Sequence, residues 1–246
     1  MIGVISAAAT RALLGRRRTL LLVLFAAVPV LVALLARDRG ANASETAAAL
    51  IDVLVIRAVL PITALVLGTA ALGSELEDGT AVFLLTSPVP RSSIVAAKLL
   101  VAAGGTALIA GGSALAAGLI VATDSASVGV VLAAVVGVVA GAVLYAALFL
   151  AASVVTNRAL IVGLLYTLVW EGALASLFAG TRLLSIRQYI LAIVDAVSGL
   201  LSRPYGNPFG ETLETSTAVV LGAVVLAISV AVAIARLRAW EIGPAD

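Results

Sequence analysis

The amino-acid sequence predicts an all-α integral membrane protein that crosses the bilayer six times. Of its 246 residues, 63% are hydrophobic and 11% are charged, whereas soluble domains have about 45–50% apolar residues with glycine included and about 25% charged residues. The apolar residues gather in runs near the roughly 20 residues that a helix needs to cross the hydrocarbon core. Because lipid cannot hydrogen-bond a backbone, such runs fold as helices. The expected spans are Thr19–Ala36, Leu50–Leu72, Leu99–Ala122, Val128–Val155, Ala159–Ala179 and Thr217–Ala235.

The first 18 residues are expected to form an interfacial amphipathic helix that leads into the first span. Apolar residues at roughly helical spacing precede the basic block Arg16–Arg18, a pattern typical of a helix that lies at the membrane surface. A disordered basic tail is one alternative. A cleaved signal peptide is another, but Thr19–Ala36 is longer than the usual signal core of about 7–15 residues. The apolar residues concerned are Ile2, Ile5, Ala9 and Leu13.

The spans are joined mostly by short polar loops, which are expected at Arg37–Ala49, Thr123–Ser127 and Thr156–Arg158. In the fourth span, Gly137 and Gly141 form a GxxxG pair, which allows another helix to pack closely against this span. Two longer interruptions remain, at residues 73–98 and 180–216, and these are the candidate functional segments.

Residues 73–98 are expected to form a short helix, a turn and the start of a second helix. Ser74 and Glu77 fit a capping box, and Gly79 can break the helix that follows. Pro88 and Pro90 prevent a regular helix across the turn. Such a segment should lie along the membrane surface instead of crossing it.

Residues 180–216 contain a second amphipathic helix. Its apolar residues are spaced by three and four positions, which is the period of a helix with one apolar face. At this length it should lie in the outer interface or dip into the bilayer as a re-entrant segment, and serve either as a lid or as a gate. The apolar residues are Leu183, Ile186, Ile190, Ile193, Val197 and Leu200.

The distribution of basic residues predicts that both termini are cytoplasmic. With the termini inside, the inner segments hold nine basic residues and the outer segments hold five, and the side richer in Lys and Arg is normally the cytoplasmic one. Residues 73–98 are then cytoplasmic. The inner set is Arg11, Arg16, Arg17, Arg18, Arg91, Lys98, Arg158, Arg236 and Arg238, and the outer set is Arg37, Arg39, Arg182, Arg187 and Arg203.

Two charged residues lie well inside the predicted spans, Arg57 in the second and Glu171 in the fifth. A charge at the bilayer centre costs about 2.5–3.5 kcal/mol on insertion scales, so each side chain should face protein or water. Each lies about eight residues, or roughly 12 Å, from the outer end of its span, so the two can pair. Three roles are open for these residues. They can form an ion pair that fixes helix packing, they can line a substrate path or gate, or a protonated Glu171 can relay protons.

The composition excludes several kinds of chemistry. The chain has no Cys and no His, which removes disulfides, thiol nucleophiles, zinc-type sites and imidazole catalysis. The residues before Lys98 contain no glycine cradle, so the chain has no phosphate-binding loop and is not expected to hydrolyse ATP itself. The net charge of +2 favours lipid headgroups over nucleic acid as the partner of its arginines.

Three features of residues 73–98 occur together: an acidic residue before Gly79-Thr80, a Leu-Leu-x-Ser-Pro-Val-x-Arg turn that ends at Arg91, and Lys98 at the start of the next span. In this order they resemble the cytoplasmic loop of ATP-binding-cassette (ABC) exporter permeases of the type-two family. Residues 166–172 and 181–189 are similar to the fifth span and outer loop of bacterial permeases of the same kind. With the basic N-terminal helix and six spans, the resemblance covers essentially the whole chain.

The resemblance implies a single transmembrane permease domain over residues 1–246, in the bacterial cytoplasmic membrane. This domain would pair with a second copy or a sibling permease and with two copies of a separate ATPase. ATP and Mg would be bound by that ATPase, and no cofactor or metal by this chain. Closure of the ATPase dimer would push Gly73–Arg91, the implied coupling segment, and reorient the spans. The implied coupling residues are Glu75, Glu77, Asp78, Gly79, Thr80, Thr86, Ser87, Pro88 and Arg91, with the turn at Thr156–Arg158 adding to the contact.

Two rival functions are considered. A gradient-driven carrier or ion channel would use Arg57 and Glu171 and would work without an ATPase. An intramembrane enzyme is disfavoured, because without His and Cys only carboxylate, Ser or Thr chemistry remains and the spans contain no paired Asp residues.

Overall fold

A computed structural model describes residues 16–37, 42–77, 90–174, 183–201 and 212–239, and all of the elements in these ranges are helical. Within these described ranges, five helices are long and apolar enough to cross a membrane. The fold class expected from the sequence, an all-α membrane protein, is confirmed. The elements are α2 (Arg16–Ala36), α3 (Ala43–Leu50), η1 (Ile51–Val59), α4 (Leu60–Glu77), α6 (Arg91–Val121), α7 (Ser125–Val155), α8 (Ala159–Leu165), η2 (Tyr166–Leu174), α10 (Ile186–Leu201) and α11 (Thr215–Ala239).

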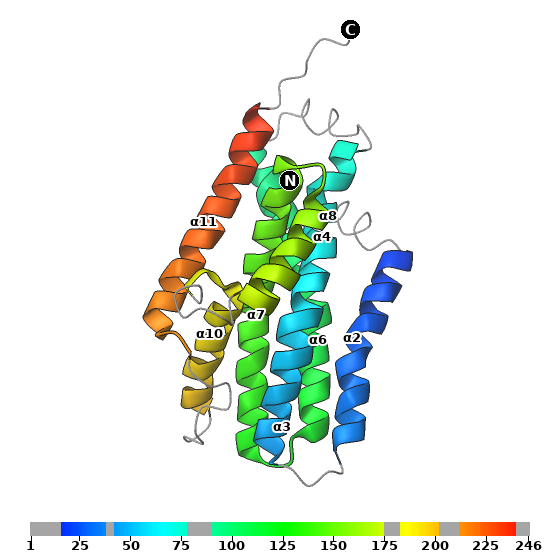
Figure 1. Cartoon of the computed structure of the whole chain (residues 1–246), viewed down its shortest axis with the longest axis vertical. Helices are drawn as coiled ribbons and strands as arrows, with labels where there is room; N and C mark the ends of the chain where they lie inside the picture. The colour runs from blue at the N-terminus through cyan, green and yellow to red at the C-terminus, as the bar shows by residue number, and fades with distance from the viewer. Residues whose placement is uncertain (1–15, 38–41, 78–89, 175–182, 202–211, 240–246) are drawn as a thin grey trace.

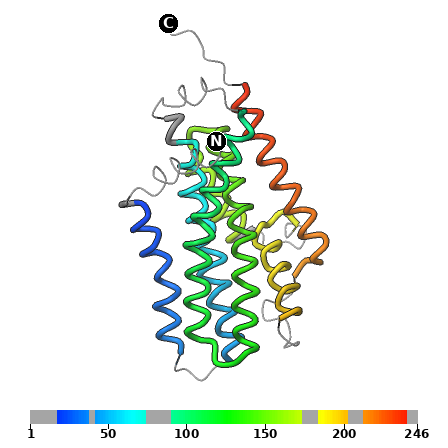
Figure 2. Tube along the Cα trace, turned by 180° about the vertical axis from the view of Figure 1, so that it is seen from behind, coloured from blue at the N-terminus to red at the C-terminus, as the bar shows by residue number. Residues whose placement is uncertain are grey.

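Helix α7 is the centre of the bundle. It packs against α4, α6, α10 and α11, while α2 and α11 lie at opposite edges (Figures 1 and 2). Many of its buried positions are Gly, Ala or Ser, and small residues let neighbouring backbones come close in a membrane. The composition of the fourth predicted span therefore explains why so many helices can gather around it.

The second span is a continuous helical run of α3, η1 and α4, and it begins earlier than expected. The sequence prediction placed residues 43–49 in a loop, but they are helical. Their sequence, ASETAAA, is rich in the best helix former, and Glu45 in the first turn interacts favourably with the helix dipole. This run widens into the π-helix η1 at Ile51–Val59, which the 3.6-residue periodicity used for the prediction cannot detect.

The second run also ends later than expected. Helix α4 continues without a break through Glu77, so Ser74 does not begin a new helix and the expected capping box is wrong. Helix α6 begins at Arg91, directly after Pro90, which confirms the start of a second helix within residues 73–98, two turns before the predicted span Leu99–Ala122. A working capping box is found instead at Asp124, whose carboxylate accepts the Ser127 N–H at 2.8 Å. The Ser127 hydroxyl also donates to this carboxylate, and the two hydrogen bonds from Ser127 lower the pKa of Asp124.

The fifth predicted span, Ala159–Ala179, is helical from Ala159 to Leu174 as α8 and η2. Residues 175–182 lie outside the described ranges, so whether this fifth predicted span crosses the whole membrane, for a total of six crossings, stays a prediction. The N-terminal interfacial helix also stays a prediction, because residues 1–15 lie outside those ranges and Arg16–Arg18 belong to α2.

Helix α10 is the amphipathic helix expected after the fifth span, and it packs into the bundle. It runs antiparallel to α7, with Ile190 against Gly141 and Val194 against Gly137. Figure 1 shows it beside the half of α7 that begins at Ser125. The GxxxG pair is therefore the docking surface for α10, and whether this helix dips into the bilayer stays a prediction.

Gly141→Ala is expected to loosen the contact between α7 and α10. A Cβ at this position would lie 2.8 Å from Ile190 Cγ1 and 2.9 Å from Leu60 Cδ2, and overpacking of this kind destabilises by about 1–3 kcal/mol. Thermal unfolding in a mild detergent measures the loss. Gly104→Ala is the matched control, since a Cβ there meets nothing within 4 Å. Equal melting temperatures for the two variants would contradict the docking role of Gly141.

Candidate functional site

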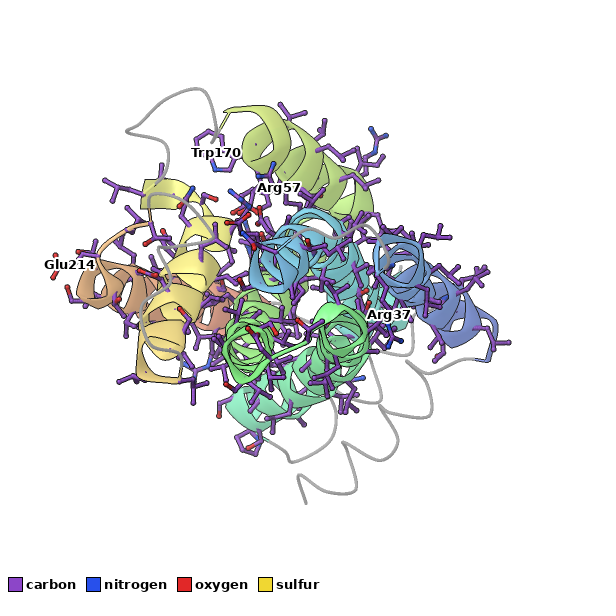
Figure 3. The ribbon with its side chains drawn as sticks, turned by 90° about the horizontal axis from the view of Figure 1, so that it is seen from below. Arg37, Arg57, Trp170 and Glu214 are labelled. Atoms are coloured by element: carbon purple, nitrogen blue, oxygen red, sulfur yellow. The ribbon has the colours of Figure 1, made fainter. Side chains whose placement is uncertain are left out.

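A network of polar side chains lies where η1, α7, η2 and α10 meet. Figure 3 looks along the bundle and shows Arg57 between η1, η2 and α10, on the side where Trp170 lies. The network contains two carboxylates, two guanidinium groups and two tyrosine hydroxyls. Its members are Asp52, Arg57, Tyr145, Tyr166, Glu171 and Arg187.

Glu171 anchors the first turn of α10. Its Oε1 atom accepts the backbone N–H of Ile186 at 2.8 Å and that of Arg187 at 3.3 Å. The first N–H groups of a helix have no partner inside the helix and favour a negative charge nearby. Glu171 thus acts as a cap supplied by another helix, and it holds the N-terminal end of α10 inside the bundle.

Two tyrosines complete the surroundings of Glu171. Tyr145, a fully buried residue of α7, donates its hydroxyl to Oε2. Tyr166 donates to Oε1 at 3.2 Å. Because hydrogen bonds to a charged group are stronger than those between neutral groups, this carboxylate joins α7, η2 and α10 at one point.

Asp52 and Arg187 form a second junction, between η1 and α10. The Arg187 Nη2 atom lies 2.7 Å from Asp52 Oδ2 and its Nε lies 3.1 Å from Oδ1. The exposed fractions of the two side chains are 14% for Asp52 and 17% for Arg187. This bidentate pair satisfies the carboxylate in the geometry that guanidinium groups prefer. Since Arg187 also donates its backbone N–H to Glu171, it links the two junctions.

Arg57 occupies the edge of the network. Its Nη2 atom lies 3.2 Å from Asp52 Oδ2, and its side chain is 52% exposed. It lies close to the midpoint of the helical run Ala43–Gly73 that is long enough to span the membrane. A charge at that depth costs about 2.5–3.5 kcal/mol if it faces lipid, so a partner other than lipid is required there.

Both π-helices place a polar pair five residues apart. Arg57 contacts Asp52 within η1, and Tyr166 contacts Glu171 within η2. In an α-helix the facing neighbours are three or four residues apart, whereas the wider π-helix turn brings residue i+5 close to residue i. The two widened turns are therefore what allows these pairs to form.

An ion pair between Arg57 and Glu171 was one of the alternatives left open by the sequence, but the structure gives each of them another partner. Arg57 contacts Asp52, and Glu171 binds tyrosines and the start of α10. Arg187 was assigned to the outer loop, whereas its side chain reaches the helix of the second span. Their role in a substrate path stays a prediction.

The structure describes the two ends of the expected coupling segment but not its middle. Glu75 and Glu77 belong to the last turn of α4, and Arg91 is the first residue of α6. Both ends lie beside the end of α7, because Leu72, Ile94 and Val154 share one apolar cluster. The other predicted coupling residues, Asp78, Gly79, Thr80, Thr86, Ser87 and Pro88, lie outside the described ranges.

Fold and site together define a multi-pass helical membrane protein with a polar network inside its bundle. A family model described as ABC-2 family transporter protein matches residues 14–173. The chain therefore belongs to the ABC-2 family of transporter membrane proteins, which confirms the resemblance seen in the sequence. It is a permease component of an ABC transporter, and membrane proteins of this family work with ATPase partners. No curated protein matches the chain.

Proposed function

We propose that the chain is the permease subunit of an ATP-driven exporter in a bacterial cytoplasmic membrane. A separate ATPase, in two copies that bind ATP and Mg, docks on residues 73–98, and a second permease copy or a sibling completes the complex. Both termini face the cytoplasm. The family match supports the permease role and covers the docking segment, and the excess of basic residues at one end of the bundle supports the orientation.

The observation that carries the coupling proposal is the continuous helical run from Ala43 to Glu77. One end of this run enters the docking segment, and its first half carries Asp52, which binds Arg187 of α10. A displacement at Glu77 therefore reaches the polar network along a single helix. For ATP binding to drive the change, docking must be stronger in one conformational state than in the other.

Glu77→Ala is expected to uncouple the ATPase from the membrane domain. We expect at least about tenfold less ATPase subunit to co-purify with the tagged chain in mild detergent, because loss of a charged contact at an interface weakens binding by several kcal/mol. Mass spectrometry and an ATPase assay of the eluate give the measurement. Arg91→Ala, at the other end of the segment, should behave in the same way.

Glu45→Ala is the matched control, since Glu45 is exposed in the first turn of the same helical run, at its opposite end. It should leave the yield of ATPase unchanged. A well-folded chain that purifies without any ATPase under several extraction conditions would overturn the proposal and favour the gradient-driven carrier or channel.

A further inference from the structure

Arg57 is the more loosely held of the two arginines that contact Asp52. Asp52, which Arg57 contacts, is already bound by Arg187 through Nε and Nη2. The contact of Arg57 itself is longer, at 3.2 Å, and involves one of its nitrogens. Removal of Arg57 would thus leave the carboxylate of Asp52 paired, and the guanidinium of Arg57 has donors to spare.

The other carboxylate of the network is also occupied. Glu171 accepts two backbone N–H groups of α10 and the hydroxyls of Tyr145 and Tyr166. Among the residues that the structure describes, neither carboxylate of the network therefore neutralises Arg57 fully, although Arg57 lies close to the middle of a span. A bound anion would supply the missing charge and accept the remaining N–H groups.

The surroundings of Arg57 favour an anion attached to an apolar chain. Val53, one turn earlier on η1, is 52% exposed, and Leu168 on η2 is 65% exposed. Trp170 lies on the same side of the bundle as Arg57 (Figure 3). These side chains lie on helices of the membrane bundle, so a soluble ion would have to leave water to reach Arg57, whereas an amphipathic molecule can bring an acidic head to this depth with its chain against apolar surroundings.

We propose that Arg57 binds the acidic head, a carboxylate or phosphate, of an amphipathic molecule where η1, η2 and α10 meet. This names a substrate class for the proposed exporter and in that respect rests on the proposed function. The head would approach the positive edge of the network, and its chain would lie along the exposed apolar side chains of η1 and η2.

Fluorescence quenching of Trp170 tests the assignment. The sequence has two tryptophans, Trp170 and Trp240, so the full-length Trp240→Phe variant reports from Trp170 alone. In a nonionic detergent at alkaline pH, 9,10-dibromostearate is compared with its methyl ester, which has the same chain and bromines but no charge. We expect the acid to quench at a concentration at least about tenfold lower than the ester, as for a charge-assisted hydrogen bond.

Arg57→Gln should abolish the difference between acid and ester, whereas Arg57→Lys should keep part of it. Arg37→Gln is the control, because Arg37 follows the last residue of α2 and lies away from Arg57 (Figure 3), and it should keep the full difference. Melting temperatures show that each variant is folded. Equal quenching by acid and ester in the parent protein, or an unchanged difference in Arg57→Gln, would overturn the proposal.

Inorganic phosphate distinguishes the source of the anion. If millimolar phosphate leaves quenching by the acid unchanged, the amphipathic ligand is supported. A different result would overturn the amphipathic assignment. If phosphate displaces the acid in an Arg57-dependent way, and the ester and the acid quench equally, the site binds soluble anions. These measurements need no ATPase, so their failure is separate from a failure of the co-purification experiment.

Discussion

Glu171→Ala is expected to release the first turn of α10 from the bundle and to abolish transport. The substitution removes the acceptor of the Ile186 and Arg187 N–H groups and of the Tyr145 hydroxyl. Each buried donor left without a partner costs about 1–3 kcal/mol, so the total loss of stability is about 3 kcal/mol or more. Thermal unfolding in detergent measures the loss, and hydrogen exchange at the two amides locates it.

Glu214→Ala is the control for this prediction, since Glu214 is exposed just before α11 and its carboxylate accepts the hydroxyl of the nearby Ser216. It should change the melting temperature little. Glu171→Gln keeps one oxygen acceptor and should fall between the parent and Glu171→Ala. If Glu171→Ala melts like the control and its α10 amides stay protected, the capping role of Glu171 is excluded.

The sequence predicted the positions of the helices better than it predicted which helices pack against each other. The apolar runs indicate the spans because lipid leaves a backbone few alternatives. The spacing of Ile186 and Ile190 indicates α10 because an amphipathic face repeats every three to four residues. The GxxxG pair of α7 indicates a close approach. That α10 is the helix packed there depends on tertiary contacts, which these patterns do not contain.

The polar network was missed for a reason that lies in helix geometry. The charges well inside the predicted spans are Arg57 and Glu171, and their equal depth made a pair between them one possible arrangement. Asp52 was overlooked because it lies near the predicted start of its span, and Arg187 because it was placed in a loop. The signal that could have found the network is the i,i+5 spacing of Asp52 with Arg57, and of Tyr166 with Glu171, inside apolar runs. The spacing fits a π-helix, and π-helical turns are frequent at functional sites.

The two junctions differ in what they connect, and this bears on transport. Glu171 fixes α10 to η2 and α7, while Arg187 fixes α10 to the run that ends at Glu77. Movement of α10 relative to these helices therefore requires at least one junction to open. The Asp52–Arg187 pair lies on the helical run that ends at Glu77, so under the proposed function it is the junction more directly linked to the docking segment.

Asp52→Asn and Arg187→Gln are expected to be strongly non-additive. The pair is largely but not fully buried, and removal of one partner of a buried ion pair leaves the other charge uncompensated, at a cost of up to about 3–5 kcal/mol. The double variant removes both charges, so its stability should recover part of this loss and show a coupling energy well above about 1 kcal/mol. Melting temperatures of the parent, the two single variants and the double variant complete the cycle.

Arg57→Gln provides the internal comparison, because Arg57 contacts the same carboxylate from a half-exposed position. Exposed pairs contribute about 0–1 kcal/mol, so its cycle with Asp52→Asn should show a much smaller coupling energy. If the two cycles gave equal coupling energies, Arg57 and Arg187 would neutralise Asp52 jointly, and α10 would not depend on one ion pair. A large coupling for Arg187 alone would make that pair the hinge between docking segment and gate.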